Sequence, residues 1–552
     1  LKGTTIGTVT DATGHYFLKN LPEGNFMMEV SSVGYKTVTR SVTLKKGKTL
    51  EENFELEEDA IALDGVVVSA NRSETTRRLA PTLVNVVDLK LFETTNSSTL
   101  SQGLNFQPGV RVETNCQNCG FQQVRINGLD GPYTQILIDS RPVFSALSGV
   151  YGLEQIPASM IERVEVMRGG GSALFGSSAI AGTINIITKE PLRNSGQLSH
   201  TITSIGGSSA FDNNTSLNAS LVTDDHRAGL YIFGQNRHRS GYDYDGDGFT
   251  ELPKLKNQTV GFRSYLKTST YSKLTFEYHH MQEFRRGGDM LDRPPHEAHI
   301  AEQLQHSIDG GSLKYDYFSP NEKNRLSVFA SAANTDRDSY YGPGNDPLKA
   351  YGKTTDLTAM GGVQYVHTFD KCLFMPSDLT AGLEYNRDRL KDNMWGYDRH
   401  TDQTVKVYSA FLQNEWKNKH WGILIGGRLD KHNMVDDVIF SPRANLRFNP
   451  TDNINLRLSY SSGFRAPQAF DEDMHIENVG GTVAMIERAK DLKEEKSQSF
   501  SASADMYHRF GAFQTNLLVE GFYTRLTLWN FVIENGFCSN AVNHMIKDSE
   551  EQ

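Results

Sequence analysis

The sequence predicts a mainly β protein with a small N-terminal β-sandwich, a compact α/β domain and a long transmembrane antiparallel β-barrel. Three observations support this. Short alternating segments separated by turn residues fill positions 1–58. A glycine cluster lies between two short strands near the C-terminal end of the region 73–192. Long amphipathic strands follow from residue 193. At 552 residues the chain is too long for one ordinary core, so several domains are expected.

Composition narrows the class of protein. Only 38% of residues are hydrophobic, and no run approaches the roughly 18 apolar residues that a transmembrane helix needs. The same low hydrophobicity fits a β-barrel, because only the outward half of each strand is apolar. The net charge of −10 argues against nucleic acid as a partner, since such binders carry a basic domain.

The N-terminal region alternates apolar and polar residues at 8–10, 16–18 and 28–30, with turn residues at 11–14 and 22–24. This pattern predicts a β-sandwich over residues 1–58. The motifs Gly7-Thr-Val-Thr-Asp-Ala-Thr-Gly14, Leu21-Pro-Glu-Gly24 and Val33-Gly-Tyr35 resemble the carboxypeptidase-regulatory-like domain. The opening strand of that family has no counterpart here, so we expect the start of the domain to be missing.

Residues 59–72 form a linker that contains a short β-prone strip. Its members are Val66, Val67, Val68, Ser69 and Ala70. Such a strip can pair with the edge strand of another protein. It can equally be an ordinary linker strand, and the residues alone leave both interpretations open.

The region 73–192 is marked by its glycines. Strands at 164–167 and 183–187 flank Gly169, Gly170, Gly171 and Gly176, where the backbone must turn tightly. A phosphate-binding P-loop is excluded, because Gly176 is followed by two serines and not by lysine.

Residues 161–189 resemble the plug domain of TonB-dependent outer-membrane receptors, and two further motifs agree. These are Leu104-Asn-Phe-Gln-Pro-Gly-Val110 and Val124-Arg-Ile-Asn-Gly128. The resemblance implies a plug over residues 73–192, lying inside the barrel. It implies that the strip at 66–70 is the TonB box, which docks on TonB in the periplasm. The plug-motif residues are then Arg125, Gly128, Arg168, Gly169, Gly171 and Gly176.

From residue 193 to 552 the pattern is that of a barrel with a polar lumen. Leu456 and Leu458 interleave with Asn455 and Arg457, and residues 273–280 alternate in the same way. Inward charges would disrupt the core of a soluble sandwich, which is the alternative, but suit a barrel. The region can supply on the order of 14 to 16 strands. The family closes its barrel with 22, so we expect this barrel to be incomplete at its C-terminal end.

One acidic turn predicts a structural calcium site. Asp243, Asp245, Asp247 and Glu251 place carboxylates at alternate positions around a glycine turn, as calcium sites do. Lys254 stands where an EF-hand has its glutamate, so the pattern is not an EF-hand. A plain acidic hairpin turn is the alternative.

Cys116 and Cys119 are expected to form a local disulfide. No histidine is near them in the sequence, and no second Cys-x-x-Cys is present for a closed zinc site. In an oxidising compartment a disulfide is the simplest state.

Arg465 and His475 belong to a last constellation. The segments 464–467 and 491–497 resemble two boxes that flank a loop in many receptors, haem receptors included, where a histidine between them holds iron. This makes Arg465 and His475 candidate ligand contacts, although the second box lacks its usual Asn-Pro. A solvated loop histidine is the alternative. No catalytic set is present in the spacing, which predicts that the chain is not an enzyme and requires no cofactor.

The resemblance as a whole implies a receptor of the Bacteroidota type in the outer membrane of a Gram-negative bacterium, with the N-terminal domain in the periplasm. The expected function is TonB-dependent uptake of a scarce metal chelate, namely a ferric siderophore, haem or cobalamin. Expected partners are TonB with its inner-membrane proton-driven partners, the metal chelate, outer-membrane lipids and a surface lipoprotein of the kind that covers related importers. A SusC-like glycan importer and a non-transporting receptor or adhesin are the alternatives.

Overall fold

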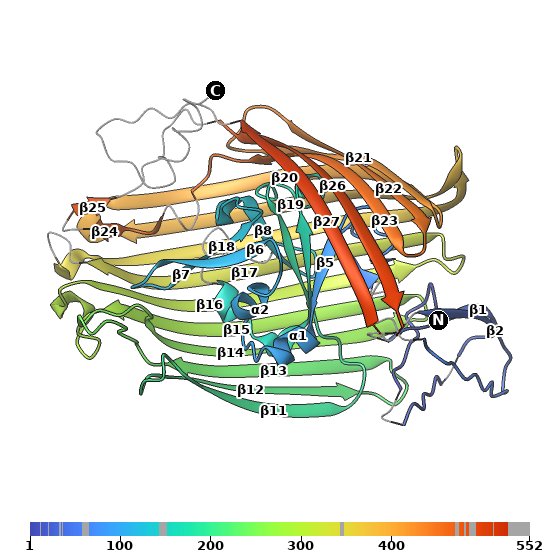
Figure 1. Cartoon of the computed structure of the whole chain (residues 1–552), viewed down its shortest axis with the longest axis horizontal. Coiled ribbons are helices and arrows are strands. Elements are labelled where there is room, and N and C mark those ends of the chain that lie inside the picture. Colours follow the sequence, from blue (N-terminus) through green and yellow to red (C-terminus); the bar gives the residue numbers. More distant parts are fainter. Residues whose placement is uncertain are drawn as a thin grey trace.

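The computed structural model describes residues 1–10, 13–19, 21–32, 35, 37–57, 66–142, 152–342, 347–469, 474–479, 482–484, 493–511 and 513–527. Within them a large antiparallel sheet curls around an α/β domain, and a small N-terminal sheet lies outside one end (Figure 1). None of the helices in these ranges is long and apolar enough to cross a membrane.

The N-terminal region contains one two-stranded antiparallel sheet, β1 (Gly24–Val30) with β2 (Val38–Leu44). The predicted segments at 8–10 and 16–18 are not strands, so the described part of this region does not form the expected sandwich. Phe17 is 70% exposed, and Val42 is the one buried hydrophobic side chain among the described residues up to 57. Without a buried apolar face, there is little to hold a second sheet in place.

The α/β domain is built on a four-stranded sheet in the order β5-β9-β10-β8, in which β10 pairs parallel to β8. Its apolar core includes Val164, Val166, Ile184 and Ile186 from the two central strands. The elements of this region are β3 (Val66–Val67), β4 (Thr75–Thr76), β5 (Val84–Asp88), α1 (Leu89–Thr94), α2 (Leu100–Leu104), β6 (Val110–Cys116), β7 (Phe121–Ile126), η1 (Gly131–Tyr133), β8 (Thr134–Ile138), α3 (Gly152–Gln155), η2 (Ala158–Met160), β9 (Ile161–Arg168), α4 (Ser172–Phe175) and β10 (Gly182–Thr188).

Fifteen strands form the large sheet, each paired antiparallel with the next along the chain. They are β11 (Ser195–Ser204), β12 (Phe211–Val222), β13 (Ala228–Arg239), β14 (Lys254–Ser269), β15 (Ser272–Gly288), β16 (Ala301–Phe318), β17 (Asn324–Gly342), β18 (Tyr351–Cys372), β19 (Met375–Met394), β20 (Arg399–Lys417), β21 (Trp421–His432), β22 (Ile439–Thr451), β23 (Ile454–Arg465), β26 (Glu495–Phe510) and β27 (Phe513–Thr527). The loops carry η3 (Pro295–Glu297), η4 (Pro347–Lys349), η5 (Trp395–Tyr397), β24 (Glu477–Val479) and β25 (Thr482–Ala484). Among the described residues, β11 and β27 do not pair with each other, so this sheet is an open barrel.

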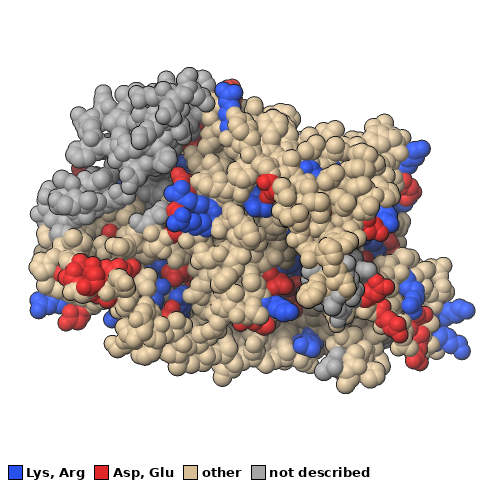
Figure 2. All heavy atoms as spheres, in the orientation of Figure 1, with Lys and Arg blue, Asp and Glu red and all other residues tan. Residues whose placement is uncertain are grey.

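The strands have the polarity that the sequence predicts. Leu458 is 56% exposed on the outside, whereas the neighbouring Arg457 is 3% exposed and points inward. Phe276 and Tyr278 are likewise exposed, and Glu277 and His279, which alternate with them, are buried. Outward apolar and inward polar side chains are the pattern of a barrel surrounded by lipid. In Figure 2 the largest groups of charged side chains lie toward the two ends of the molecule.

The two ends of the barrel differ in their connections. Residues 270–271, 373–374 and 452–453 are short turns at one end, which we call the short-turn end. The other, long-loop end carries the connections 240–253, 289–300 and 466–494. The N-terminal region lies at the short-turn end, where the Thr5 backbone N–H donates to the Thr270 carbonyl at 2.8 Å. The α/β domain lies in the lumen of the curled sheet (Figure 1).

Candidate functional site

The strip at 66–70 is bound to the α/β domain. Val67, Ser69 and Ala70 are fully buried, and only Val66 is exposed. The Val68 and Ser69 backbone N–H groups each donate to Glu165 Oε2 at 2.9 Å, and the Ser69 hydroxyl donates to the same oxygen at 2.8 Å. One carboxylate oxygen thus holds three donors of the strip, an arrangement that we call the strip contact.

Glu165 is itself fixed in the central strand β9. Its other oxygen, Oε1, accepts from Arg163 Nε at 3.0 Å and from Arg163 Nη2 at 2.9 Å. Asn185 of β10 donates to the Ser69 hydroxyl at 3.0 Å. Because the Glu165 side chain is fully buried, its charge depends on these partners. The strip cannot leave without exposing that carboxylate to water or to a new donor.

Just beyond the strip, the chain is attached to the inner face of the barrel. Arg443 donates to the Ala70 carbonyl at 2.9 Å, and Asn71 donates to Glu415 at 2.7 Å. Arg72 forms a buried ion pair with Glu384. The last residue of the strip, Ala70, and the two residues after it therefore form a second attachment, separate from the strip contact.

A buried charge cluster joins the middle of the α/β domain to the barrel. Glu154 of α3 lies 3.4 Å from Arg237, 3.2 Å from Arg239 and 2.8 Å from Arg285. Burial acts to raise the pKa of Glu154, but the three guanidinium groups outweigh it and lower the pKa to about 2. Asp139 pairs with Arg263 in the same manner, and its pKa is also lowered, against the effect of burial.

The predicted plug-motif residues shape turns and form ion pairs of the α/β domain. Gly128, Gly169 and Gly176 have φ of +84°, +82° and +84°, a region that side chains disfavour. Gly171 is packed so closely that a Cβ would lie 2.9 Å from Thr183.

The two motif arginines are engaged in ion pairs. Arg125 lies 2.5 Å from both Glu113 and Asp130 within the α/β domain. Arg168 pairs with Glu520 of β27 and donates to the Pro108 carbonyl at 3.3 Å. Arg125 therefore stabilises the domain itself, and Arg168 links it to the barrel.

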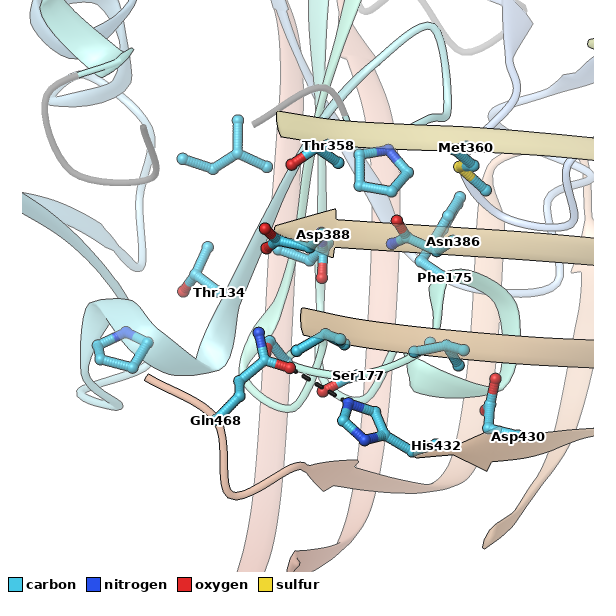
Figure 3. Close-up of a pocket in the computed structure, with 18 of the residues that line it drawn as sticks. Thr134, Phe175, Ser177, Thr358, Met360, Asn386, Asp388, Asp430, His432 and Gln468 are labelled. Carbon is cyan, nitrogen blue, oxygen red and sulfur yellow. Dashed lines mark hydrogen bonds between the residues drawn. The ribbon is translucent and has the colours of Figure 1, made fainter. Parts of the chain in front are cut away.

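A cavity of about 190 Å³ lies between the α/β domain and strands β18 to β21. Thr134, Phe175 and Ser177 line one side, and Asp388 and Asp430 approach from the barrel strands (Figure 3). Its volume is below the roughly 300–1,000 Å³ of sites that enclose a whole small-molecule ligand. The domain thus obstructs the lumen in this state, with room for water or a small group beside it.

His432 and Gln468 line the same cavity, where His432 Nε2 lies 3.3 Å from Gln468 Oε1 (Figure 3). Arg465, a predicted ligand residue, is not among the lining residues. Its guanidinium lies over the Tyr133 ring at 5.7 Å and 4.0 Å from Glu495. Arg465 therefore connects the end of β23 to the α/β domain.

The expected disulfide between Cys116 and Cys119 is not formed. The three cysteines in the described ranges, Cys116, Cys119 and Cys372, are not disulfide-bonded. Instead, Cys116 and Cys119 meet Glu302 of β16 and His475 of the loop after β23, and one ligand atom from each lies within 4.8 Å of all the others. We call these four residues the apex cluster. The disulfide prediction was wrong because these two partners were invisible from the local sequence.

Hydrogen bonds shift the pKa values inside the apex cluster. Contact with Cys119 lowers the pKa of the Cys116 thiol. Burial acts to lower the pKa of His475, but contacts with Cys116 and Glu302 outweigh it and raise the pKa to about 10. His475 therefore points into this cluster and is not a solvated loop residue.

The acidic turn is partly as expected. Asp243, Asp245 and Asp247 bring one carboxylate oxygen each within 4.8 Å of the others. Glu251 is not part of this group, and its carboxylate accepts from the Tyr244 backbone N–H. Asp243 also accepts from Gly246 and Gly248 at 2.7 and 2.9 Å, so the aspartates stabilise the turn itself. Calcium binding stays a prediction.

Comparison with protein families identifies the chain. Residues 183–536 match the TonB dependent receptor-like, beta-barrel family, and residues 76–183 match the TonB-dependent Receptor Plug Domain. The chain belongs to the TonB-dependent receptors. Residues 1–68 match the CarboxypepD_reg-like domain, although the described part of that region has only one hairpin. The α/β domain is thus the plug, and the protein is an outer-membrane receptor with its N-terminal domain on the periplasmic, short-turn side.

The chain is similar in sequence to the vitamin B12 transporter BtuB of Vibrio vulnificus (strain CMCP6) and to a ferric enterobactin receptor of Pseudomonas aeruginosa. The first is 24% identical over 424 residues, which are 74% of this chain and 64% of the relative. The second is 23% identical over 480 residues, or 73% of this chain and 61% of the relative. The chain thus spans less than two thirds of either relative. The first relative is named as a transporter and the second as a receptor, and neither is named as an enzyme. This agrees with the prediction that the chain is not an enzyme.

Solved structures share the fold. The siderophore receptor PirA from Acinetobacter baumannii superposes with a TM-score of 0.65 at 18% identity, covering 82% of this chain and 78% of PirA. A mutant of the ferric enterobactin receptor PfeA from Pseudomonas aeruginosa, in complex with enterobactin, gives 0.66 at 19% identity, covering 80% of this chain and 71% of PfeA. At these identities the likeness concerns the fold alone.

Several functional residues escaped the sequence analysis. Glu165 and Glu154 resemble any other charged residue of a strand or helix, and no local pattern marks their partners. Glu302 lies at the start of a barrel strand, where an inward carboxylate is common. Only the Cys-x-x-Cys spacing pointed toward the apex cluster, and its meaning depended on residues far away in the chain.

Proposed function

We propose that the protein takes up a scarce metal chelate across the outer membrane, driven by TonB acting on residues 66–70. The observation that carries the proposal is the strip contact: a β-prone strip on the periplasmic side is bound by a single carboxylate to the central sheet of the plug. Force applied to the strip is transmitted to β9, because Glu165 lies in that strand.

The proposed sequence of events follows from these contacts. Ligand binding at the long-loop end loosens the plug, and the strip exchanges its hydrogen bonds with Glu165 for an edge strand of TonB. A pull on the strip then displaces part of the plug and widens the small cavity beside β18 to β21 into a path. The ligand class is supported by the named relatives, which are receptors or transporters for vitamin B12 and ferric enterobactin.

Haem is the least supported of the three chelates. The imidazole Nε2 of His475 lies 3.4 Å from Cys119 Sγ and 3.4 Å from Glu302, inside the apex cluster. An iron axial ligand would need that nitrogen to face an open site. Cobalamin and ferric siderophores are therefore favoured.

The test is deletion of residues 66–70 in the receptor, expressed in cells that lack other routes for the ligand. Uptake of cobalamin and of ferric enterobactin is measured, together with their binding to whole cells. The deletion should abolish uptake and leave binding intact. A control deletion of residues 45–49, an exposed segment that follows β2, should preserve both.

Uptake that survives deletion of 66–70 would contradict the coupling role of the strip. Binding of neither chelate, with binding of an oligosaccharide, would favour the glycan importer. Ligand binding without any uptake in the unaltered receptor would favour a receptor or adhesin that does not transport.

A further inference from the structure

The apex cluster combines four donors of different chemistry at one point. Cys116 is the last residue of β6 in the plug, and Cys119 lies in the following β6–β7 loop. Glu302 comes from the start of β16, and His475 comes from the loop after β23. Cys116 Sγ lies 3.0 Å from Glu302 Oε2, and His475 Nε2 lies 3.4 Å from both Cys119 Sγ and Glu302 Oε2. These residues come from three separate parts of the fold and meet with their ligand atoms facing each other.

The separations fit a tetrahedral metal centre. With Zn–N and Zn–O bonds of about 2.0–2.1 Å and Zn–S bonds of about 2.3 Å, tetrahedral geometry puts nitrogen and oxygen ~3.3 Å apart and sulfur ~3.5 Å from either. The His475–Glu302 and His475–Cys119 distances are both 3.4 Å, which matches. Cys116 and Glu302, at 3.0 Å, would separate by about half an ångström on binding a metal ion.

The cysteine loop is already shaped for this role. The Cys119 backbone N–H donates to Cys116 Sγ at 3.3 Å, which stabilises negative charge on the sulfur. Gly120 follows with φ +69°, a conformation that lets the loop turn directly after the second cysteine. Arg285 of β15 donates to the Gly120 carbonyl at 3.2 Å and so fixes the loop to the barrel.

Apolar side chains enclose the donors. Phe121, Leu304, Tyr341, Met394 and Ile476 pack in one cluster with Cys119, which is completely buried. The His475 ring lies 5.6 Å from the Phe121 ring and 5.4 Å from the Tyr341 ring. Such a shell orients the imidazole and keeps water away from the metal–ligand bonds.

The donor set selects the kind of metal. Calcium and magnesium take oxygen ligands, so two sulfurs and an imidazole exclude both. Two thiolates, one imidazole and one carboxylate suit zinc, which prefers four-coordinate tetrahedral sites with these donors. The positive charge of the ion would also offset that of three buried anionic groups, which are costly to bury together without a cation.

We propose that Cys116, Cys119, Glu302 and His475 bind one Zn²⁺ ion. The ion joins the plug, the barrel strand β16 and a loop of the long-loop end through a single centre. This inference does not depend on the proposed uptake of a chelate.

The site can be tested on the purified receptor in detergent, reduced and freed of metal with a chelator. Zn²⁺ binding is measured by calorimetry, and Co²⁺ serves as a coloured substitute. We expect one ion per chain, with the intense visible bands of tetrahedral Co²⁺ and a near-ultraviolet thiolate band. Cys116→Ser with Cys119→Ser should abolish the thiolate band, and His475→Ala or Glu302→Gln should weaken Zn²⁺ binding at least about 100-fold. Cys372→Ser is the matched control and should bind as the unaltered chain does.

A second measurement needs no variant. Alkylation of the unaltered receptor, followed peptide by peptide, should modify Cys116 and Cys119 slowly with Zn²⁺ bound and at least tenfold faster after chelation, while Cys372 reacts equally in both. The proposal is overturned if Zn²⁺ binds with unchanged affinity to the double cysteine variant. It is also overturned if the unaltered chain binds no stoichiometric Zn²⁺, or if metal leaves the alkylation of both thiols unchanged.

Discussion

The plug is held differently at its two ends. At the short-turn end, the strip contact consists of hydrogen bonds from two backbone amides and a hydroxyl to one carboxylate oxygen. At the long-loop end, the apex cluster consists of thiol, imidazole and carboxylate groups from three parts of the fold. Hydrogen bonds can be replaced one by one by water or by a partner strand, whereas a metal centre loses its affinity when any ligand leaves.

The difference suggests a division of roles within one domain. The strip end is suited to repeated release, because each of its bonds has an equivalent in an edge strand of another protein. The apex end is suited to closure, because Cys119 and Glu302 are buried and the cysteine loop is held in place by Gly120 and Arg285. Between them, Glu154 and its three arginines resist sliding of the plug along the lumen.

The largest expected effect comes from breaking this middle cluster with Glu154→Gln. Removing this charge takes from the buried Arg239 the carboxylate with which it pairs, and breaking such a pair typically costs about 3–5 kcal/mol. Arg237 keeps its ion pair with Asp212, and Arg285 keeps its ion pair with Glu283. Hydrogen–deuterium exchange of plug peptides should then accelerate from strip to apex. Asp130→Asn, at a half-exposed carboxylate paired with Arg125, is the control and should have little effect. Unchanged exchange in Glu154→Gln would show that the two ends alone hold the plug.

The same cluster sets a pH dependence. The pKa of Glu154 is lowered in the folded state to about 2, so its contribution is complete above the ordinary value of 4.5 and is lost as the pH falls through 2. The plug should therefore remain protected down to about pH 4 and lose this contribution progressively between about pH 4 and 2. Exchange of the α3 peptide, corrected for intrinsic rates, checks this. In Glu154→Gln that acid step should be absent.

A smaller effect is expected from loosening only the strip end. Glu165→Ala removes the acceptor of three hydrogen bonds, but the freed donors can turn to water, so we expect a net loss close to that of one bond to a charged group, about 1.5–3 kcal/mol. A loss of about 3 kcal/mol would raise amide exchange at Val68 and Ser69 roughly 100-fold. Glu165→Gln keeps an acceptor oxygen and should give a smaller increase.

The control for the strip end is Glu162→Gln. Glu162 is a half-exposed carboxylate in the same strand that contacts the same Arg163. Exchange at the apex peptides should stay unchanged in all three variants. An equal rise at Val68 in Glu162→Gln would mean that Arg163, and not Glu165, controls the strip.

A part of the fold could be predicted from the sequence where its pattern lies within a short stretch of residues. The barrel could be predicted because the polarity of its strands alternates with a period of two, as at Arg457 and Leu458. This alternation can be recognised without knowledge of distant residues. The plug followed from glycines whose positive φ values leave a mark on the sequence, as at Gly169 and Gly176. In the N-terminal region, residues 1–68 match the predicted regulatory-like domain, but its described residues form one hairpin only, because alternation at 16–18 does not by itself create a buried face.

The site was far less predictable, since its contacts join distant positions. Cys119 and His475 are separated by 356 positions, so a search for a nearby histidine could not find this partner. Their meeting is set by the pairing of β15 with β16 and by the seating of the plug, which no local pattern encodes. Glu165 has the same difficulty, because the strip that it binds lies 96–97 positions earlier.

The smallest expected effect comes from adding a single methyl group beside the apex cluster, which tests whether the two ends of the plug are independent. Gly287 of β15 faces the cysteine loop, and a Cβ there would lie 1.9 Å from the Asn118 carbonyl oxygen, so the loop must shift. If the apex cluster binds Zn²⁺, Gly287→Ala should weaken that binding about tenfold, a cost of roughly 1.4 kcal/mol. Gly361→Ala, whose nearest neighbour would be 3.7 Å away, is the control.

In Gly287→Ala, amide exchange at Val68 and Ser69 should not change, because the strip contact shares no residue with the displaced loop. Faster exchange there would show instead that a small shift at the apex reaches the strip through the plug, and the two ends would then have to be treated as one coupled unit.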